Sequence, residues 1–218
     1  MRERARSIED KQQRSEALLD AAEALAIELG GIRFITVAAV TERVGLHRTG
    51  VLRYYASKEE LLLELAERGW RRWRDAIVAT LSGRAGLGPA EIAGLFVDTI
   101  TSMPVFCDLL THVTLSLEGD VDIERARRYK TNAFAAHDDI VAAVEGAGSM
   151  TGEQIAGLVA TTLMLASGLW QVSHPTPTLV RLYAQEPRWG HVALDFAPRL
   201  RQLLQATALG LASDTGAA

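Results

Sequence analysis

Residues 36–61 read TVAAVTERVGLHRTGVLRYYASKEEL and contain two short helical patterns that meet at a glycine. The Thr36 hydroxyl can cap the first helix. Four residues of this helix share one face that can be buried: Val37, Val40, Thr41 and Val44. Gly45 then ends the helix, because glycine tolerates the left-handed backbone of a sharp turn at little cost. This arrangement predicts a helix-turn-helix, whose second helix enters the major groove of DNA.

The second helix of this motif is expected to begin at His47 or Arg48 and to be too short to be stable without packing. Gly50 inside it costs about 1 kcal/mol relative to alanine, so the helix is expected to be loose until it meets DNA. Val51, Leu52 and Tyr55 are expected to pack inward. The candidate DNA contacts here are His47, Arg48, Thr49, Arg53 and Tyr54.

Arg48 and Arg53 are favoured for base edges or adjacent phosphates, because arginine can form paired hydrogen bonds with guanine. Two alternatives stay open at this point. Either arginine could be merely solvated, and the whole pattern could be an ordinary helical hairpin with Tyr54 and Tyr55 in its core.

A third helix is predicted to start after Ser57, because Ser57 and Glu60 have the spacing of a capping box. Lys58 then lies in its first turn. Helix starts attract phosphate, and a lysine strengthens the attraction, so Lys58 is a further candidate for DNA contact.

Residues 12–70 resemble the tetracycline-repressor (TetR) family of bacterial transcription regulators. The matching residues are Ala21, Ala22 and Leu25 of an amphipathic first helix, Gly30, Gly31, Thr36, Gly45, Tyr54, Tyr55 and Ser57-Lys58-Glu59-Glu60-Leu61. The resemblance implies a three-helix DNA-binding head and an all-helical body that binds a ligand and forms a dimer. It also implies that Thr36, Tyr54 and Lys58 touch backbone phosphates.

Two departures from the family pattern fall in the second helix. His47 stands where the family usually has serine or threonine, and Thr49-Gly50-Val51-Leu52 replaces a frequent Gly-Thr-Leu-Tyr. The operator sequence of a relative therefore cannot be transferred to this chain.

The predicted fold is all-α, with a helix-turn-helix DNA-binding domain joined to a C-terminal ligand-binding and dimerisation domain. We expect an N-terminal arm and head over residues 1–56, a connecting helix over 57–82, the body over 83–212 and a flexible tail over 213–218. The sequence shows no convincing strand.

Helical periodicity predicts the buried faces and the helix ends. The first helix should bury Leu18, Ala22, Leu25 and Leu29, and the connecting helix Leu62, Ala66, Gly69, Trp73 and Ile77. Further helices are expected from Pro89 to a break at Met103-Pro104, then to about Glu118, from about Asp122 to Glu145, and from a Thr151/Gln154 capping box to Ser173. A last helix is marked by Val192, Phe196, Leu200, Leu203 and Thr207.

The charge of the chain is unevenly divided. Its net charge is −4, but residues 1–56 carry nine Lys or Arg against eight Asp or Glu, a net charge of +1. A basic N-terminal arm is formed by Arg2, Arg4, Arg6, Lys11 and Arg14. This arm is expected either to follow the DNA backbone or enter a minor groove, or to be a solvated tail.

No apolar run predicts a membrane span and no signal peptide is visible, so we expect a soluble protein of the cytoplasm without a membrane partner. Cys107 is the single cysteine, which excludes an intramolecular disulfide and any multi-cysteine zinc site.

The last two long helices are apolar on more than one stripe, which favours a homodimer over the alternative that they are only monomer core. The candidate ligand-binding residues are Phe96, Phe106, Cys107, Leu110, His112, Tyr129, Phe134, His137 and Trp170. These positions show no cluster of charge, which argues for a neutral, largely apolar effector. Each of them could also be simple core.

Catalysis is not predicted. The chain has no Gly-x-Ser-x-Gly elbow, phosphate-cradling glycine loop or His-Glu-x-x-His, and His137-Asp138-Asp139 places its groups on different helix faces. We expect no cofactor, no metal and no catalytic residue. The competing hypothesis is a non-catalytic ligand-binding or protein-interaction dimer whose head no longer binds DNA.

Overall fold

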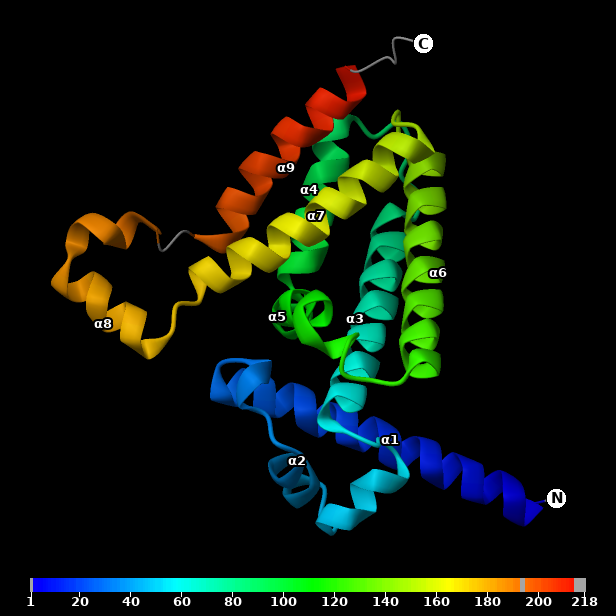
Figure 1. Ribbon diagram of the computed structural model, residues 1–218. Helices are drawn as coiled ribbons and strands as arrows, with labels where there is room; N and C mark the ends of the chain where they lie inside the picture. The colour runs from blue at the N-terminus through cyan, green and yellow to red at the C-terminus, as the bar shows by residue number, and fades with distance from the viewer. Residues whose placement is uncertain (1, 193–194, 214–218) are drawn as a thin grey trace.

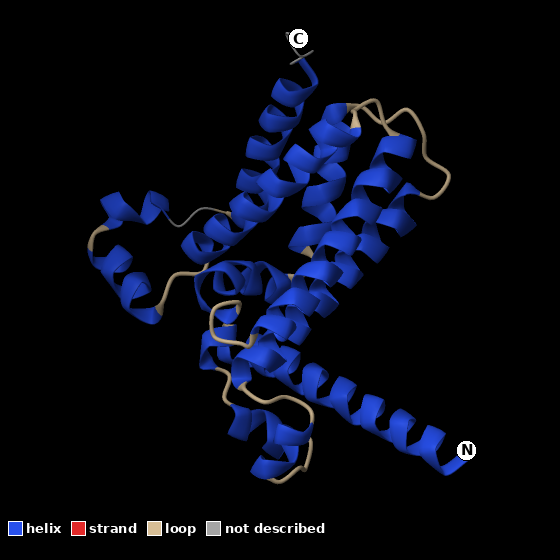
Figure 2. Ribbon diagram, turned by 45° about the vertical axis from the view of Figure 1, so that its right-hand side comes forward, coloured by secondary structure: helices blue, strands red, loops and turns tan. Residues whose placement is uncertain are grey.

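The computed structural model describes residues 2–192 and 195–213, and within them the side chains of 11–47, 50–190 and 195–213. The described chain is helical, and its only β-type pairing is an isolated parallel bridge between Leu87 and Gly148 (Figures 1 and 2). The elements are α1 (Arg2–Leu29), η1 (Ile32–Phe34), α2 (Val37–Arg43), η2 (Arg48–Arg53), α3 (Lys58–Leu81), α4 (Pro89–Thr101), α5 (Pro104–His112), η3 (Val113–Leu117), α6 (Ile123–Ala147), α7 (Gly152–Ser173), α8 (Pro177–Gln185), η4 (Pro187–Val192) and α9 (Phe196–Ser213). The all-α prediction is confirmed.

Helix α3 joins the two parts of the molecule. It starts beside α1 and runs upward alongside α6 (Figure 1). Every residue expected on its inner face is buried: Leu62, Ala66, Gly69, Trp73 and Ile77. A helix that contributes to both cores can transmit a displacement from one to the other.

Helix α1 buries Leu18, Ala22 and Leu25 as expected, but the prediction for Leu29 is wrong, because this side chain is 45% exposed. Leu29 is the last residue of α1, and the chain turns away at Gly30, whose φ is +76°. No element covers that position after the turn.

The predicted helix starts are mostly confirmed. Pro89 and Pro104 occupy the first turns of α4 and α5, where a missing N–H is harmless. Asp122 caps α6, and Thr151 and Gln154 form both bonds of the capping box of α7. The segment expected to continue α5 is instead a short π-helix, η3, and the last helix begins at Phe196, so that Val192 belongs to η4.

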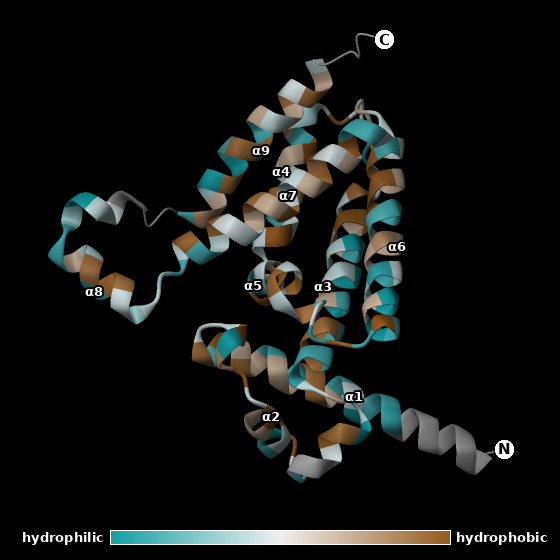
Figure 3. Ribbon diagram, in the orientation of Figure 1, coloured by the Kyte–Doolittle hydropathy of each residue, from teal (hydrophilic) through white to brown (hydrophobic). Residues whose placement is uncertain are grey.

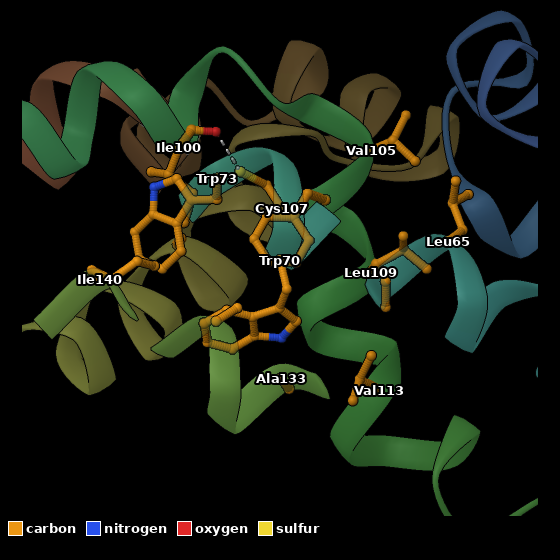
Figure 4. Close-up of a cluster of buried hydrophobic side chains, with 14 of the residues drawn as sticks. Leu65, Trp70, Trp73, Ile100, Val105, Cys107, Leu109, Val113, Ala133 and Ile140 are labelled. Atoms are coloured by element: carbon orange, nitrogen blue, oxygen red, sulfur yellow. Dashed lines mark hydrogen bonds between the residues drawn. The ribbon is translucent and has the colours of Figure 1, made fainter. Parts of the chain in front are cut away.

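The body core is centred on aromatic rings from three helices (Figure 4). Trp70 and Trp73 of α3 contact Phe106 of α5, and Trp73 also meets Phe96 of α4, with centroid separations of 5.8–6.4 Å. Gly69 makes this packing possible. A Cβ atom built there would lie 2.2 Å from Cδ2 of Phe106, so the aromatic ring lies directly against the backbone of α3.

Helices α7 and α9 pack on each other, and α9 also covers α4. By length and composition alone, helix α7 is long and apolar enough to cross a membrane, but the core helices of soluble proteins meet the same criteria. Only 28% of its most apolar window is buried within the chain. Helices α4 and α5–η3 pass the same test as a pair bent by 91°. Large apolar side chains remain exposed on both partners, Met164 on α7 and Leu209 on α9.

The segment formed by α8 and η4, which we call the α8–η4 segment (residues 177–192), stands away from the other helices (Figure 1). No residue of α8 is buried, although Leu179 and Val180 are apolar and Figure 3 shows hydrophobic positions along it. The α8–η4 segment connects α7 to α9 without covering either.

Candidate nucleic-acid interface and body cavity

The turn of the predicted helix-turn-helix is formed as its sequence requires. The hydroxyl of Thr36 accepts a hydrogen bond from the amide of Ala39 at 3.1 Å and caps α2. Gly45 has a φ of +68°, and its amide donates to the carbonyl of Glu42 while Leu46 donates to Thr41. This pair of bonds is the Schellman motif, which satisfies the last carbonyls of the helix and reverses the chain.

The second helix of the motif is a 3₁₀ helix, η2, and not the short α-helix that the pattern predicts. The amides of Gly50 and Tyr54 donate to carbonyls three residues earlier, those of His47 and Val51. The prediction that Leu52 packs inward is wrong: it is 60% exposed, whereas Val51 and Tyr55 are buried.

The candidate DNA contacts lie around this turn. Thr36, His47 and Arg53 have exposed side chains, and Tyr54 is half-buried against the head core. The predicted contacts Arg48 and Thr49 have side chains outside the described residues. So do Arg2, Arg4 and Arg6 of the basic arm, whose backbone continues α1, while Lys11 and Arg14 are exposed.

Lys58 is the first residue of α3, and its Nζ donates to the carbonyl of Arg33 at 3.3 Å. The hydroxyl of Ser57 accepts the amide of Glu60, whereas the Glu60 carboxylate takes the amide of Ala56, one residue before the position that a regular capping box uses. The start of α3 is thus fixed on both sides of the cap.

Tyr55 anchors η2 to α1. Its hydroxyl lies 2.7 Å from Oγ of Ser15, and burial raises the pKa of Tyr55 to about 12. The second of the two neighbouring tyrosines is therefore core, and only Tyr54 reaches the surface.

The guanidinium of Arg68 ties α3 to α1, a contact that sequence reasoning missed. Nη1 of Arg68 lies 2.6 Å from Asp20 and 3.4 Å from Glu23, and Nη2 is paired with Glu16. The Arg68 side chain is 7% exposed. The spacing of the three carboxylates, four and then three residues apart on one helix, was an available signal for a shared cation.

A second contact between head and body is made by Asp108 of α5, which is also absent from the sequence-based predictions. One carboxylate oxygen accepts the backbone amide of Ile32 in η1 at 2.7 Å, and the other accepts the side-chain amide of Gln171 in α7 at 2.9 Å. His112 lies 3.8 Å away on the next turn of α5. We call this group the Asp108 bridge. A carboxylate at a buried position within the apolar run PVFCDLL was the signal for it.

The body contains a cavity of about 480 Å³ between α3, α5, η3, α6 and α7. It is lined by Trp70, Leu110, Val113, Thr114, Glu118, Tyr129, Lys130, Ala133, Phe134, His137, Ala160, Leu163, Met164 and Ser167. Of the nine candidate ligand-binding residues, the structure brings four together here: Leu110, Tyr129, Phe134 and His137.

The other five candidates lie elsewhere. Phe96 and Cys107 are fully buried in the core, where the Cys107 thiol donates to the carbonyl of Ile100. Phe106 lies against Gly69 and faces a separate groove between α1, α3 and α5. His112 belongs to the Asp108 bridge, and Trp170 stacks on His174 with ring centroids 3.7 Å apart. Periodicity identified these side chains as inward-facing but could not show which inward direction each one takes.

Polar groups are few in the cavity wall. Glu118 and Lys130 pair with each other at 2.8 Å, and Nδ1 of His137 lies 2.9 Å from the neighbouring Asp138. Deeper in, Nε1 of Trp70 donates to the hydroxyl of Tyr129 at 3.2 Å, and burial raises the pKa of Tyr129 to about 12. Within the described residues, no group of three or more His, Cys, Asp or Glu is placed to hold a metal ion.

Comparison with known proteins agrees with this architecture. Residues 18–65 match the family model "Bacterial regulatory proteins, tetR family", and residues 67–215 match "Tetracyclin repressor-like, C-terminal domain". No curated protein matches the chain significantly. Among solved structures, the transcriptional regulator FadR from Bacillus subtilis, determined in complex with stearoyl-CoA, is similar with a TM-score of 0.51 and 13% identity, over 92% of this chain and 99% of that one. The two models together cover most of the sequence, and the chain belongs to the TetR family of bacterial regulatory proteins.

Proposed function

We propose that the protein is a homodimeric repressor that binds a palindromic DNA operator and releases it when a small molecule enters the cavity. The observation that carries this proposal is the position of α3. The same helix begins directly after η2 of the head and supplies Trp70 to the cavity wall. We assign the N-terminal arm and head to residues 1–56, the connector to 57–82, the body to 83–212 and a tail to 213–218.

In this proposal the DNA contacts are Thr36, His47, Arg48, Thr49, Arg53, Tyr54 and Lys58. The side chains described among them lie on or next to the turn of the motif, and Lys58 adds a cation to a helix start. The η2 segment is short and contains Gly50, so we expect its geometry to tighten when it enters the major groove.

The dimer interface is assigned to α7 and α9. Most of the apolar window of α7 remains uncovered within one chain, and burying such a surface against a second copy is favourable. A two-fold pair of heads can then read two major-groove half-sites about 34–36 Å apart.

The effector is assigned to the cavity of about 480 Å³, a size in the usual range for small-molecule sites. Its wall is mainly apolar, and its two charged residues neutralise each other. These observations favour a neutral, largely apolar effector.

Release of DNA requires that the effector bind the released state more tightly than the DNA-bound state. Two contacts offer a path for this coupling. Helix α3 leads from the cavity wall to the head, and α5 leads from Leu110 in the cavity wall to the Asp108 bridge on η1.

The proposal is tested by recovering and footprinting genomic fragments that the purified protein binds, at two salt concentrations. Lys58→Ala should weaken binding and lower the slope of log affinity against log salt by about one phosphate contact. The matched control is Arg84→Ala, which removes an exposed cation of the body away from the cavity, and it should leave the slope unchanged. A folded dimer that enriches no site would contradict the repressor function and favour a head that does not bind DNA.

A further inference from the structure

We propose that the effector carries an uncharged hydrogen-bond acceptor, such as a ketone, ester or amide carbonyl, that accepts a hydrogen bond from the Tyr129 hydroxyl inside the cavity. This inference rests on the proposed function, because it assumes that the cavity is the effector site. It adds the chemical group by which the site would select its ligand.

The first step concerns the direction of one hydrogen bond. Tyr129 and Trp70 face each other across the cavity wall, with Nε1 of Trp70 3.2 Å from the Tyr129 hydroxyl oxygen. An indole nitrogen can only donate, so the phenol oxygen is the acceptor in this contact. The proton of the Tyr129 hydroxyl is therefore not used in that bond.

The second step concerns the missing acceptor. Tyr129 is 4% exposed, and the bond from Trp70 is the one that its hydroxyl makes with the described part of the chain. Glu118 is near enough for its charge to contribute to the raised pKa of Tyr129, but within the described residues no hydrogen bond joins its carboxylate to the Tyr129 hydroxyl. Buried donors are almost always satisfied in folded proteins. A donor without a protein acceptor at a cavity wall is a group that a ligand can satisfy.

The third step concerns the charge state of the site. Burial raises the pKa of Tyr129 to about 12, so the hydroxyl keeps its proton and remains a donor at physiological pH. A ligand carboxylate would lose its hydration against an apolar wall, where the charges of Glu118 and Lys130 already neutralise each other. A neutral carbonyl oxygen avoids this penalty.

The surroundings of Tyr129 fit the rest of such a molecule. Figure 4 shows the indole of Trp70 beside Ala133 and Val113, which line the cavity with Leu163 and Met164. These side chains offer apolar contact to a hydrocarbon or aromatic skeleton and no competing donor. The Tyr129 hydroxyl would then orient the ligand within an otherwise undirected site.

The test uses two probes of the same skeleton, butyrophenone and butylbenzene, which differ by a carbonyl in place of one methylene group. Their dissociation constants are measured by calorimetry for the wild-type dimer and for Tyr129→Phe, which removes only the hydroxyl. The affinity for butyrophenone should fall about five- to tenfold in the variant, the effect of one hydrogen bond, while the affinity for butylbenzene should not fall.

The control variant is Tyr55→Phe, which removes another buried tyrosine hydroxyl at a site distant from the cavity, and it should leave both affinities unchanged. Equal changes for the two probes in Tyr129→Phe, or no binding of either probe, would overturn the proposal. Operator binding measured on the same protein without either probe separates this failure from failure of the repressor function.

Discussion

Replacing Asp108 with alanine should loosen the head from the body while leaving both parts folded. The carboxylate accepts two hydrogen bonds, one from the backbone amide of Ile32 and one from Gln171. The two losses differ in consequence. Gln171 is half-buried and has Thr111 Oγ1 3.4 Å away, so its amide retains a partner.

The amide of Ile32 has no such replacement. Ile32 is 1% exposed, and the Asp108 oxygen at 2.7 Å is the acceptor that the structure provides. Leaving a buried donor unsatisfied costs about 1–3 kcal/mol. For a chain of this size, we expect the melting temperature to fall by about 2–4 °C for each kcal/mol, hence by about 4–8 °C at the midpoint of that range.

The assay combines thermal unfolding at fixed protein concentration with effector-induced release of operator DNA. We expect the release to be weakened in Asp108→Ala, since one of the two contacts between the cavity wall and the head is lost. Asp108→Asn keeps an acceptor for Ile32 and should recover most of the stability.

The matched control is Asp98→Ala. Asp98 is 68% exposed and pairs with Arg201, and exposed pairs contribute less than about 1 kcal/mol. Equal stability losses for Asp98→Ala and Asp108→Ala would refute the argument that an unsatisfied Ile32 amide sets the cost. Unchanged effector release in Asp108→Ala would refute the coupling role of the bridge.

Three further predictions concern the core. Gly69→Ala should destabilise the protein by about 1–3 kcal/mol in a urea titration, because the new Cβ would lie 2.2 Å from Phe106. Adding Phe106→Leu should relieve part of this loss. If the stability losses of the two single variants simply add in the double variant, the clash is contradicted. Burial raises the pKa of the Cys107 thiol to about 12, so iodoacetamide at pH 8 should modify it only after unfolding, and rapid labelling of the native protein would contradict the assigned burial. The pKa values of Tyr55 and Tyr129 are raised from 10.0 to about 12 in the folded state. The stability that the two tyrosines contribute is therefore complete below pH 10 and is lost as the pH rises from 10 to 12. The free energy of unfolding should fall in that window, and it should fall less in Tyr55→Phe.

Local rules predicted the all-α fold and most helix ends. Capping boxes, proline positions and apolar periodicity each depend on neighbouring residues, and the structure follows them at Ser57, Pro89, Asp122 and Thr151. The misses also have local causes. At η2, Gly50 and the shortness of the segment allow a 3₁₀ helix in place of the predicted α-helix.

The candidate cavity was only partly predictable, because periodicity assigns a residue to the inside without assigning it to a particular space. Phe96 and Tyr129 look alike in the sequence, yet the first fills the core and the second lines the cavity. The contacts of Arg68 and Asp108 with the head span 45–76 residues, so no local pattern pairs them with their partners. Such long-range polar pairs become visible only when the packing of α1, α3 and α5 is known.

The α8–η4 segment offers a place where the chain can be interrupted without disrupting the fold. It contributes no buried residue from α8, while α7 and α9 on either side of it pack directly on each other. Exposed connections of this kind tolerate insertion and circular permutation. A fluorescent domain placed at Glu186, between α8 and η4, would be attached between the two helices that we assign to dimerisation. Energy transfer between two such domains would report assembly in living cells without altering the cavity or the head.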